Sequence, residues 1–142
     1  MPRVALDTNI LAYAEGLAQG EQNGRKVGIS LDLLDQLHRA GGGWSAPAQM
    51  LAELHNVLIR KQGLSRQQAG ARIDQWQQVA TVIATTEQVL EDAFALAARH
   101  DLPTFDAIIL AAAAEARCDR LYSEDFQPGF AWRGVEVINP FV

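Results

Sequence analysis

Hydrophobic and polar positions along the chain follow two alternating patterns. Short apolar runs, several of them rich in β-branched residues, predict strands at residues 3–6, 44–47, 79–85, 120–123 and 135–138. Longer segments with apolar residues three or four positions apart predict helices at residues 9–15, 27–39, 47–62, 66–78, 87–101 and 105–118. Because strands alternate with helices, we expect a three-layer α/β fold around a mainly parallel sheet, with residues 1–142 forming one domain.

Glycines and small polar residues mark the ends of these elements. Residues 16–24 carry three glycines and predict a loop, and the glycines at 41–43 end the helix before them. Three helices are expected to begin at hydroxyl caps, which are Ser65, Thr86 and Thr104. We expect residues 79–85 to be a buried strand. In the helix after Thr86, the residues expected to face the core are Leu90, Phe94 and Ala97.

Acidic residues stand at the ends of two predicted strands. Asp7 directly follows the strand at 3–6, and Glu124 and Asp125 follow the strand at 120–123. In a parallel α/β sheet, ligands bind at the carboxyl ends of the strands. We therefore expect these carboxylates to share one edge of the sheet.

Two further acids come from helices. Glu53 lies at the edge of an inward stripe of apolar residues at positions 50, 54, 57 and 58. Asp106 lies in the first turn of a helix so apolar that most of it must be buried. Each acid, taken alone, also has a structural explanation: a helix cap for Asp7, an outward-facing ion pair for Glu53, the helix dipole for Asp106 and turn chemistry for Asp125.

A cluster of four carboxylates has a chemical consequence. Two like charges about 4 Å apart repel by roughly 4 kcal/mol at an effective dielectric constant near 20. No lysine or arginine is adjacent to these acids in the sequence to neutralise them. A divalent cation would do so, because Mg²⁺ and Mn²⁺ favour carboxylate and water oxygens, and it would attract phosphates. Asn9 and Ser123 are placed to orient the carboxylates, although local capping explains both equally well.

Composition limits the class of protein. Hydrophobic residues make up 49% of the chain and charged residues 20%, as in an ordinary globular domain. Cys118 has no second cysteine to pair with, no apolar run reaches the roughly 18–20 residues of a membrane span, and the N-terminus does not resemble a secretion signal. We therefore expect a cytoplasmic protein. The net charge of −5 argues mildly against a general binder of polyanions, unless a metal site holds some of the acids.

Four stretches of the chain resemble the PIN-domain ribonucleases, in particular the VapC-type toxins of bacterial toxin–antitoxin pairs. They are VALDTNILAY (4–13), MLAELHNVL (50–58), FDAIILAAAAEARCDRLYSEDFQPG (105–129) and VEVINPF (135–141). The resemblance implies a PIN-like fold and a Mg²⁺- or Mn²⁺-dependent endoribonuclease that cleaves single-stranded RNA through an activated water, without a covalent intermediate. It also implies a homodimer and a small antitoxin protein that covers the acidic groove.

The resemblance assigns roles to individual residues. The catalytic acids of the family correspond to Asp7, Glu53, Asp106 and Asp125. All of them are candidate metal ligands, Glu53 the weakest. Asn9 and Ser123 correspond to polar residues beside the acids, whereas the role of Glu124 stays open.

Three basic residues around the turn after the Glu53 helix are candidates for contacts with RNA phosphates. They are Arg60, Lys61 and Arg66. Arg99 and His100 end a helix, where they would complement its dipole. None of the histidines has the spacing of a metal ligand, and we expect them to be structural or surface residues.

Two other functions remain open from the sequence. One is a catalytically inactive interaction module with a PIN-like fold, although all four acid positions are occupied. The other is a phosphatase of the haloacid dehalogenase type, which also begins with an aspartate after the first strand. That chemistry needs a second aspartate two residues on, where this chain has Asn9, and a lysine for which only Lys26 and Lys61 are available.

Overall fold

The computed structural model describes residues 2–17 and 21–142, and six short strands in these residues form one sheet. In spatial order they are β3 (Thr81–Ile83), β2 (Ser45–Pro47), β1 (Val4–Leu6), β4 (Arg120–Tyr122), β6 (Val135–Ile138) and β5 (Ala131–Trp132). The neighbouring pairs from β3 to β6 are parallel, and β5 joins β6 as an antiparallel edge strand. The sequence did not predict β5, because two residues are too short to show a strand period.

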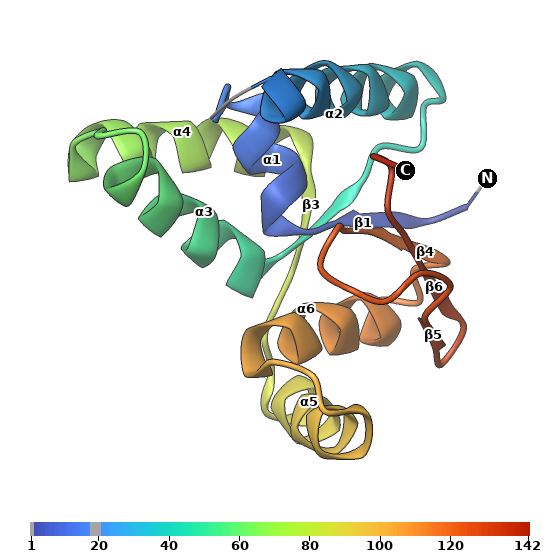
Figure 1. The fold of residues 1–142 in the computed structure, drawn as a ribbon. Helices are drawn as coiled ribbons and strands as arrows, with labels where there is room; N and C mark the ends of the chain where they lie inside the picture. The colour runs from blue at the N-terminus through green and yellow to red at the C-terminus, as the bar shows by residue number, and fades with distance from the viewer. Residues whose placement is uncertain (1, 18–20) are drawn as a thin grey trace.

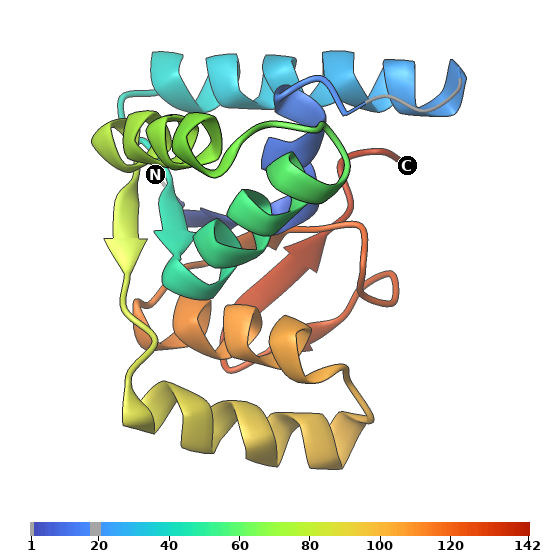
Figure 2. The ribbon, with the colours of Figure 1, turned by 90° about the vertical axis from the view of Figure 1, so that its left-hand side faces the viewer.

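Helices cover both faces of this sheet. In chain order they are α1 (Thr8–Ala14), α2 (Glu21–Arg39), α3 (Ala48–Arg60), α4 (Arg66–Val79), α5 (Glu87–His100) and α6 (Thr104–Glu115). The first four lie on one side of the sheet, and α5 and α6 pack together on the other side (Figures 1 and 2). The predicted three-layer α/β fold with a mainly parallel sheet is confirmed. In the described part of the chain, no helix is both long and apolar enough to cross a membrane.

The centre of the core is formed by β1 and α6. All three residues of β1 are buried, and so is every residue from 107 to 113 in α6. A helix buried on all sides needs no amphipathic period. This explains why α6 is a continuous run of alanine, isoleucine and leucine in the sequence.

The order of the strands reverses next to β1. β2 and β3 extend the sheet on one side of β1, and β4 returns to its other side. Because crossover connections between parallel strands are right-handed, the helices before and after this reversal lie on opposite faces of the sheet. A crevice therefore opens at the carboxyl ends of β1 and β4. β1 and β4 pair with Leu6 opposite Tyr122, and the backbone N–H of Asp7 donates to the carbonyl of Tyr122 at 3.0 Å. The residues after the two strands therefore lie side by side.

The predicted loop over residues 16–24 is wrong at its C-terminal end, because α2 begins at Glu21; residues 18–20 lie outside the described residues. Glycine within a helix costs about 1 kcal/mol relative to alanine, which is why Gly24 argued for a loop. Tertiary contacts hold this end of α2 instead. Arg25 donates to the carbonyl of Phe141 at 2.6 Å, and the neighbouring lysine forms an ion pair with the loop after β4.

The predicted cap at Thr104 is also wrong, because Thr104 is the first helical residue of α6. Pro103 is the N-cap, without a side-chain cap bond, and its carbonyl accepts the first helical hydrogen bond from Ala107 at 3.0 Å. The fixed φ of proline, here −57°, sets the chain up to enter the helix one residue earlier. Asp106 stays in the first turn.

Two predictions of burial are wrong. Residues 79–85 do not form a buried strand: Val79 ends α4, and β3 is an edge strand in which only Ile83 is buried. In α5 the inward residues are Val89, Ala93 and Leu96, one position before the predicted stripe. Phe94 is therefore 54% exposed. Both neighbouring stripes of α5 contain apolar residues, so the helical period alone did not separate them.

Candidate metal centre

Three carboxylates converge at the carboxyl ends of β1 and β4. Asp7 follows β1, Asp125 lies in the loop after β4, and Asp106 lies in the first turn of α6. Each can present one oxygen such that the three oxygens lie within 4.8 Å of one another. We call these three residues the acidic cluster. Within residues 2–17 and 21–142, no lysine or arginine forms an ion pair with any of them.

Asp7 is the buried member of the cluster, with 1% of its surface exposed. One carboxylate oxygen, Oδ1, accepts from the backbone N–H of Thr8 at 2.6 Å, so Asp7 caps α1. The other oxygen, Oδ2, accepts from the hydroxyl of Ser123 at 2.6 Å. The same Ser123 oxygen accepts from the backbone N–H of Asp125 at 3.1 Å. Ser123 thereby fixes two members of the acidic cluster relative to each other.

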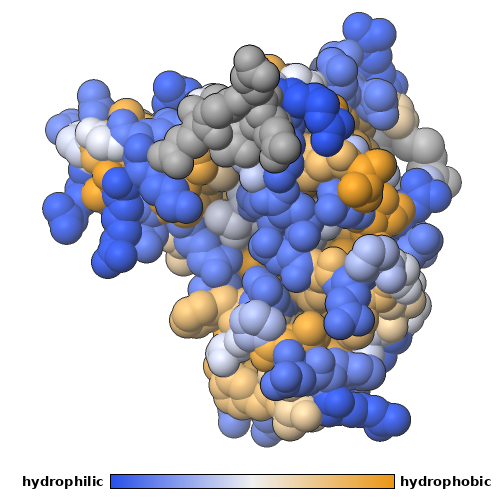
Figure 3. Space-filling model, in the orientation of Figure 1, coloured by the Kyte–Doolittle hydropathy of each residue, from blue (hydrophilic) through white to orange (hydrophobic). Residues whose placement is uncertain are grey.

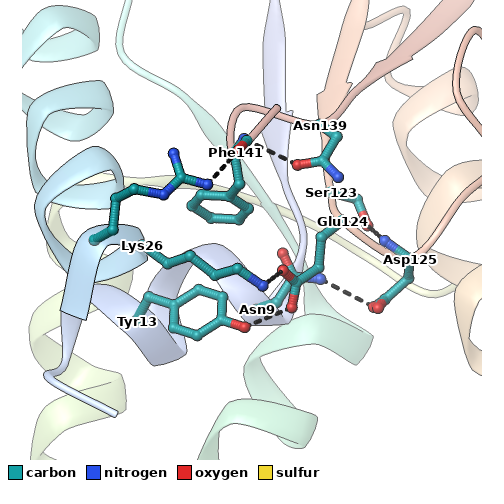
Figure 4. Close-up of polar contacts among 9 residues, drawn as sticks. Asn9, Tyr13, Lys26, Ser123, Glu124, Asp125, Asn139 and Phe141 are labelled. Carbon is teal, nitrogen blue, oxygen red and sulfur yellow. Dashed lines mark hydrogen bonds and ion pairs between the residues drawn. The ribbon is translucent and has the colours of Figure 1, made fainter. Parts of the chain in front are cut away.

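Asn9 lies in the first turn of α1 and contacts the same loop. Its side-chain Nδ2 donates to Oδ2 of Asp125 at 2.9 Å (Figure 4). Its other side-chain atom, Oδ1, is buried and accepts no hydrogen bond from the described residues. Asn9 therefore orients Asp125 and has one further acceptor beside the cluster.

Glu53 approaches the cluster from α3 but is not one of the three converging carboxylates. It is half-buried, and its Oε2 accepts from the hydroxyl of Thr8 at 2.8 Å. Its charge contributes to the raised pKa of Asp106, which places it in the same site. Thr8 could not be selected from the sequence beyond its place between Asp7 and Asn9, because its partner is 45 residues away.

Burial shifts the titration of all four acids in the same direction. It raises the pKa of Asp7 from 3.8 to about 7, against the hydrogen bonds from Ser123 and Thr8, which lower it. Burial, followed by the charges of Asp125 and Glu53, raises the pKa of Asp106 to about 6. The pKa values of Glu53 and Asp125 are raised as well, first of all by burial. The protein alone therefore disfavours full ionisation of this group.

The donor set fits a hard divalent cation. Mg²⁺ binds oxygen ligands at about 2.0–2.1 Å, so two ligands of one ion lie at most about 4.2 Å apart. The cluster oxygens, within 4.8 Å of one another, are close to this spacing. Two full charges at that separation repel by roughly 3–4 kcal/mol at an effective dielectric constant near 20, and a cation would turn this repulsion into attraction. Carboxylate-only ligation favours magnesium or manganese over zinc, which prefers nitrogen and sulfur ligands.

Glu124, whose role the sequence left open, has both carboxylate oxygens engaged away from the cluster (Figure 4). Tyr13 donates its hydroxyl to Oε1 at 2.6 Å, and Lys26 donates to Oε2 at 2.8 Å. The Lys26 ammonium also lies 5.4 Å from the ring centre of Tyr13 and 5.5 Å from that of Phe141. Glu124 thus ties α1 and α2 to the loop that carries Asp125. Sequence reasoning missed this network because its members are about a hundred residues apart.

The predicted RNA-contacting residues lie at different distances from this site. Lys61 lines a hollow of about 250 Å³ together with Asn9, Tyr13 and Asp125. We call it the α1 hollow. The Lys61 side chain therefore lies beside Asp125 of the acidic cluster but forms no ion pair with it. The other two predicted residues, Arg60 and Arg66, are exposed and do not line this hollow.

Solved structures of toxins and toxin–antitoxin complexes have a similar fold. A toxin–antitoxin complex from Klebsiella pneumoniae matches with a TM-score of 0.67 and 20% identity, over 96% of this chain and 97% of that chain. VapC20 of Mycobacterium tuberculosis, a toxin that cleaves the sarcin–ricin loop, matches with a TM-score of 0.63 and 18% identity, over 83% and 86%. FitAcB from Neisseria gonorrhoeae matches with a TM-score of 0.60 and 19% identity, over 97% and 98%. At these identities the similarity establishes the fold.

Comparison at the level of sequence gives the family. A search of curated proteins found no match. The sequence profile of the PIN domain, in contrast, matches residues 4–130, which span the acidic cluster and Glu53. The chain therefore belongs to the PIN domain family.

Proposed function

We propose that this PIN domain is a metal-dependent endoribonuclease that hydrolyses phosphodiesters of single-stranded RNA, and that it acts as the toxin of a toxin–antitoxin pair. One observation carries the proposal: Asp7, Asp106 and Asp125 present oxygens within 4.8 Å of one another without a basic partner among the described residues. Such a group is stable when charged only if it binds a cation. The similarity in fold to VapC20, a toxin that cleaves the sarcin–ricin loop, supports the same reaction class.

Each side chain of the site has a role in this proposal. Asp7, Asp106 and Asp125 would hold Mg²⁺ or Mn²⁺. A bound ion of this kind polarises a phosphoryl oxygen and lowers the pKa of water. Glu53 is suited to accept a proton from the attacking water at Oε1, because Thr8 fixes Oε2 and burial raises the pKa of the carboxyl group. Ser123 holds the Asp7 carboxylate in place.

The expected partners follow from the proposed function. RNA would lie across the acidic cluster, with Lys61 beside a phosphate. A small antitoxin protein would cover the site; a chain of similar fold is part of a toxin–antitoxin complex from Klebsiella pneumoniae, which supports such a partner. A homodimer would cover apolar surface on α5 and α6, where Phe94 and Phe105 are each 54% exposed. Light scattering of the purified chain tests the dimer.

The direct test is cleavage of total RNA with and without Mn²⁺. The wild-type chain should cleave only with the ion, and Asp106→Asn should lose about a thousandfold or more of the rate while keeping its circular dichroism spectrum. A matched control is Asp74→Asn, an exposed aspartate on α4, which should cleave at the wild-type rate. Wild-type activity of Asp106→Asn would show that the site is assigned wrongly. A wild-type chain that binds no Mn²⁺ and cleaves no RNA would favour an inactive interaction module.

A further inference from the structure

Asp125 of the acidic cluster lies at the border of two hollows. The α1 hollow contains Lys61 and the polar side chains of α1. The second hollow, of about 270 Å³, lies between the α5–α6 connection and the loop after β4. Asp125 is the residue that both hollows share. Each hollow could therefore hold a part of an RNA strand whose reacting phosphate lies at the cluster.

The second hollow has an aromatic wall, and we call it the aromatic hollow. The ring of His100 meets that of Phe130 edge to face, with centres 5.3 Å apart. Phe130 packs in turn against Phe126, with centres 5.9 Å apart. Phe126 is buried and Phe130 half-buried, whereas His100 is exposed. The wall is thus anchored in the core and ends in a ring that is open to solvent. On the face seen in Figure 3, hydrophobic residues gather in the lower half of the molecule, where α5 and α6 lie.

The backbone around this wall is fixed. The N–H of Phe130 donates to the carbonyl of Gln127 at 3.1 Å, and the carbonyl of Phe130 accepts from Val137 of β6 at 2.9 Å. On the opposite side, the N–H of Asp101 closes the end of α5 by donating to the carbonyl of Ala97. A site with fixed walls loses little conformational entropy when a ligand enters.

The aromatic hollow is lined by two carboxylates and one histidine, and no lysine or arginine of the described residues lines it. Its ionisable lining includes the carboxylates of Asp101 and Asp125, whereas Lys61 lies in the α1 hollow. Carboxylates repel phosphate but accept hydrogen bonds from the exocyclic amino groups of bases. The volume is slightly below the roughly 300 Å³ at which pockets for drug-sized ligands begin, which suits one planar ring system.

Resting on the proposed function, we propose that the aromatic hollow binds one nucleobase of the RNA strand, adjacent to the phosphate that is cleaved. The base stacks on the ring of His100 or Phe130, as single-stranded RNA commonly does on aromatic side chains. Asp101 and Gln127 face the edge of the base. Asp101 favours adenine, cytosine or guanine, which carry an amino group, over uracil. This hollow makes His100, a residue that sequence analysis assigned to the surface, a determinant of cleavage-site preference.

The test is a series of short single-stranded RNAs in which an abasic ribose replaces one nucleotide at a time on either side of the cut. With wild-type protein, one position next to the cut should be sensitive, with kcat/KM lowered about tenfold by loss of the stacked base. His100→Ala should lower kcat/KM on the intact RNA by a similar factor and abolish the sensitivity at that position alone. His100→Phe should restore both the kcat/KM on the intact RNA and the sensitivity to the abasic ribose at that position. The matched control is His38→Ala, an exposed histidine at the end of α2, which should leave the whole profile unchanged.

Two outcomes overturn the proposal while leaving the proposed function intact. In one, His100→Ala shows the wild-type profile of abasic sensitivity. In the other, it leaves RNA cleavage unchanged and weakens only the capture of the antitoxin, which would assign the hollow to a protein partner.

A second measurement keeps the subsite testable if the wild-type chain cleaves no RNA. The four nucleoside 5′-monophosphates are titrated into protein with ¹³C-labelled histidine. The His100 ring signals should shift most with AMP, CMP and GMP and least with UMP, whereas His38 should not respond. Absence of a shift at His100, or an equal shift at both histidines, would contradict the proposal.

Discussion

Removing the charge of Asp7 should stabilise the metal-free protein at alkaline pH. Asp7 is 1% exposed, and burial is the main reason that its pKa is raised from 3.8 to about 7. Asp7→Asn keeps the shape of the side chain. Its Oδ1 can still accept from the N–H of Thr8, and its amide can donate to the oxygen of Ser123, which now accepts. The substitution therefore removes a charge with little change in packing.

The size of the effect follows from proton linkage. Between pH 3.8 and about 7, the folded protein holds a proton on Asp7 that the unfolded chain has lost, so the free energy of unfolding falls by about 1.4 kcal/mol for each pH unit. Above about pH 7 the charge on Asp7 therefore costs roughly 4 kcal/mol, which is a large part of the 5–15 kcal/mol of a typical domain. Near pH 4 the cost is almost absent, because Asp7 is protonated in the folded state.

Urea denaturation in EDTA measures this difference. Asp7→Asn should raise the free energy of unfolding by roughly 2–4 kcal/mol at about pH 8 and by less than about 1 kcal/mol at about pH 4. Asp74→Asn serves as the control, since an exposed substitution usually changes stability by less than about 0.5 kcal/mol. Saturating Mn²⁺ should then reduce or reverse the stability difference between Asp7→Asn and the wild type, because a ligand at a hundred times its Kd stabilises the wild type by about 2.7 kcal/mol. If Asp7→Asn is less stable than the wild type at pH 8 in EDTA, the buried carboxylate is not a source of strain and the argument fails.

Three further predictions concern the same site. Calorimetry should show that Mn²⁺ binds the acidic cluster at least tenfold more tightly at about pH 8 than at about pH 6, and that binding releases protons. The reason is that the raised pKa values of Asp7 and Asp106 make protons compete with the ion. An affinity that does not depend on pH would contradict this prediction. Lys26→Met should leave Glu124 without its cation, and should therefore lower the free energy of unfolding by about 1–3 kcal/mol in urea titrations and weaken Mn²⁺ binding. The control is Arg39→Met, which breaks an exposed ion pair and should change the free energy of unfolding by less than about 0.5 kcal/mol. Thr8→Val should lower kcat about tenfold with little change in the Kd for Mn²⁺, because it removes the hydrogen bond that holds the Glu53 carboxylate and leaves the acidic cluster intact. If kcat and the affinity for Mn²⁺ fall by the same factor, Glu53 is instead a metal ligand.

The sequence predicted the layers of the fold because its elements differ in period and composition. It also predicted that Asp7 and Asp125 meet, because the carboxyl ends of neighbouring parallel strands must lie together, whereas Glu124, expected at the same edge, turns to Tyr13 and Lys26, and Glu53 lies beside the cluster and not in it. Asp7 and Asp125 needed only the positions of β1 and β4. Asp106 needed only the start of a buried helix. Each prediction used information within a few residues of the acid itself.

The side-chain partners could not be predicted in the same way. Thr8 and Glu53 are 45 residues apart, and Lys26 and Glu124 are 98 apart, so each pair is created by the packing of helices against the sheet. Phe94 shows the same limit within one element. Its helix has two neighbouring stripes with apolar residues, and contact with α6 selected the stripe that leaves Phe94 exposed.

The distribution of charge changes the meaning of the acidic composition. Of the 17 acidic residues in the chain, four lie in the site, namely Asp7, Glu53, Asp106 and Asp125. The remaining 13 nearly balance the 12 lysines and arginines, so the rest of the surface is close to neutral. A divalent cation would cancel half of the charge that the site concentrates. The net charge of −5 is therefore concentrated at the site where we propose that a cation binds, and the nearly neutral remainder of the surface is compatible with the proposed RNA substrate.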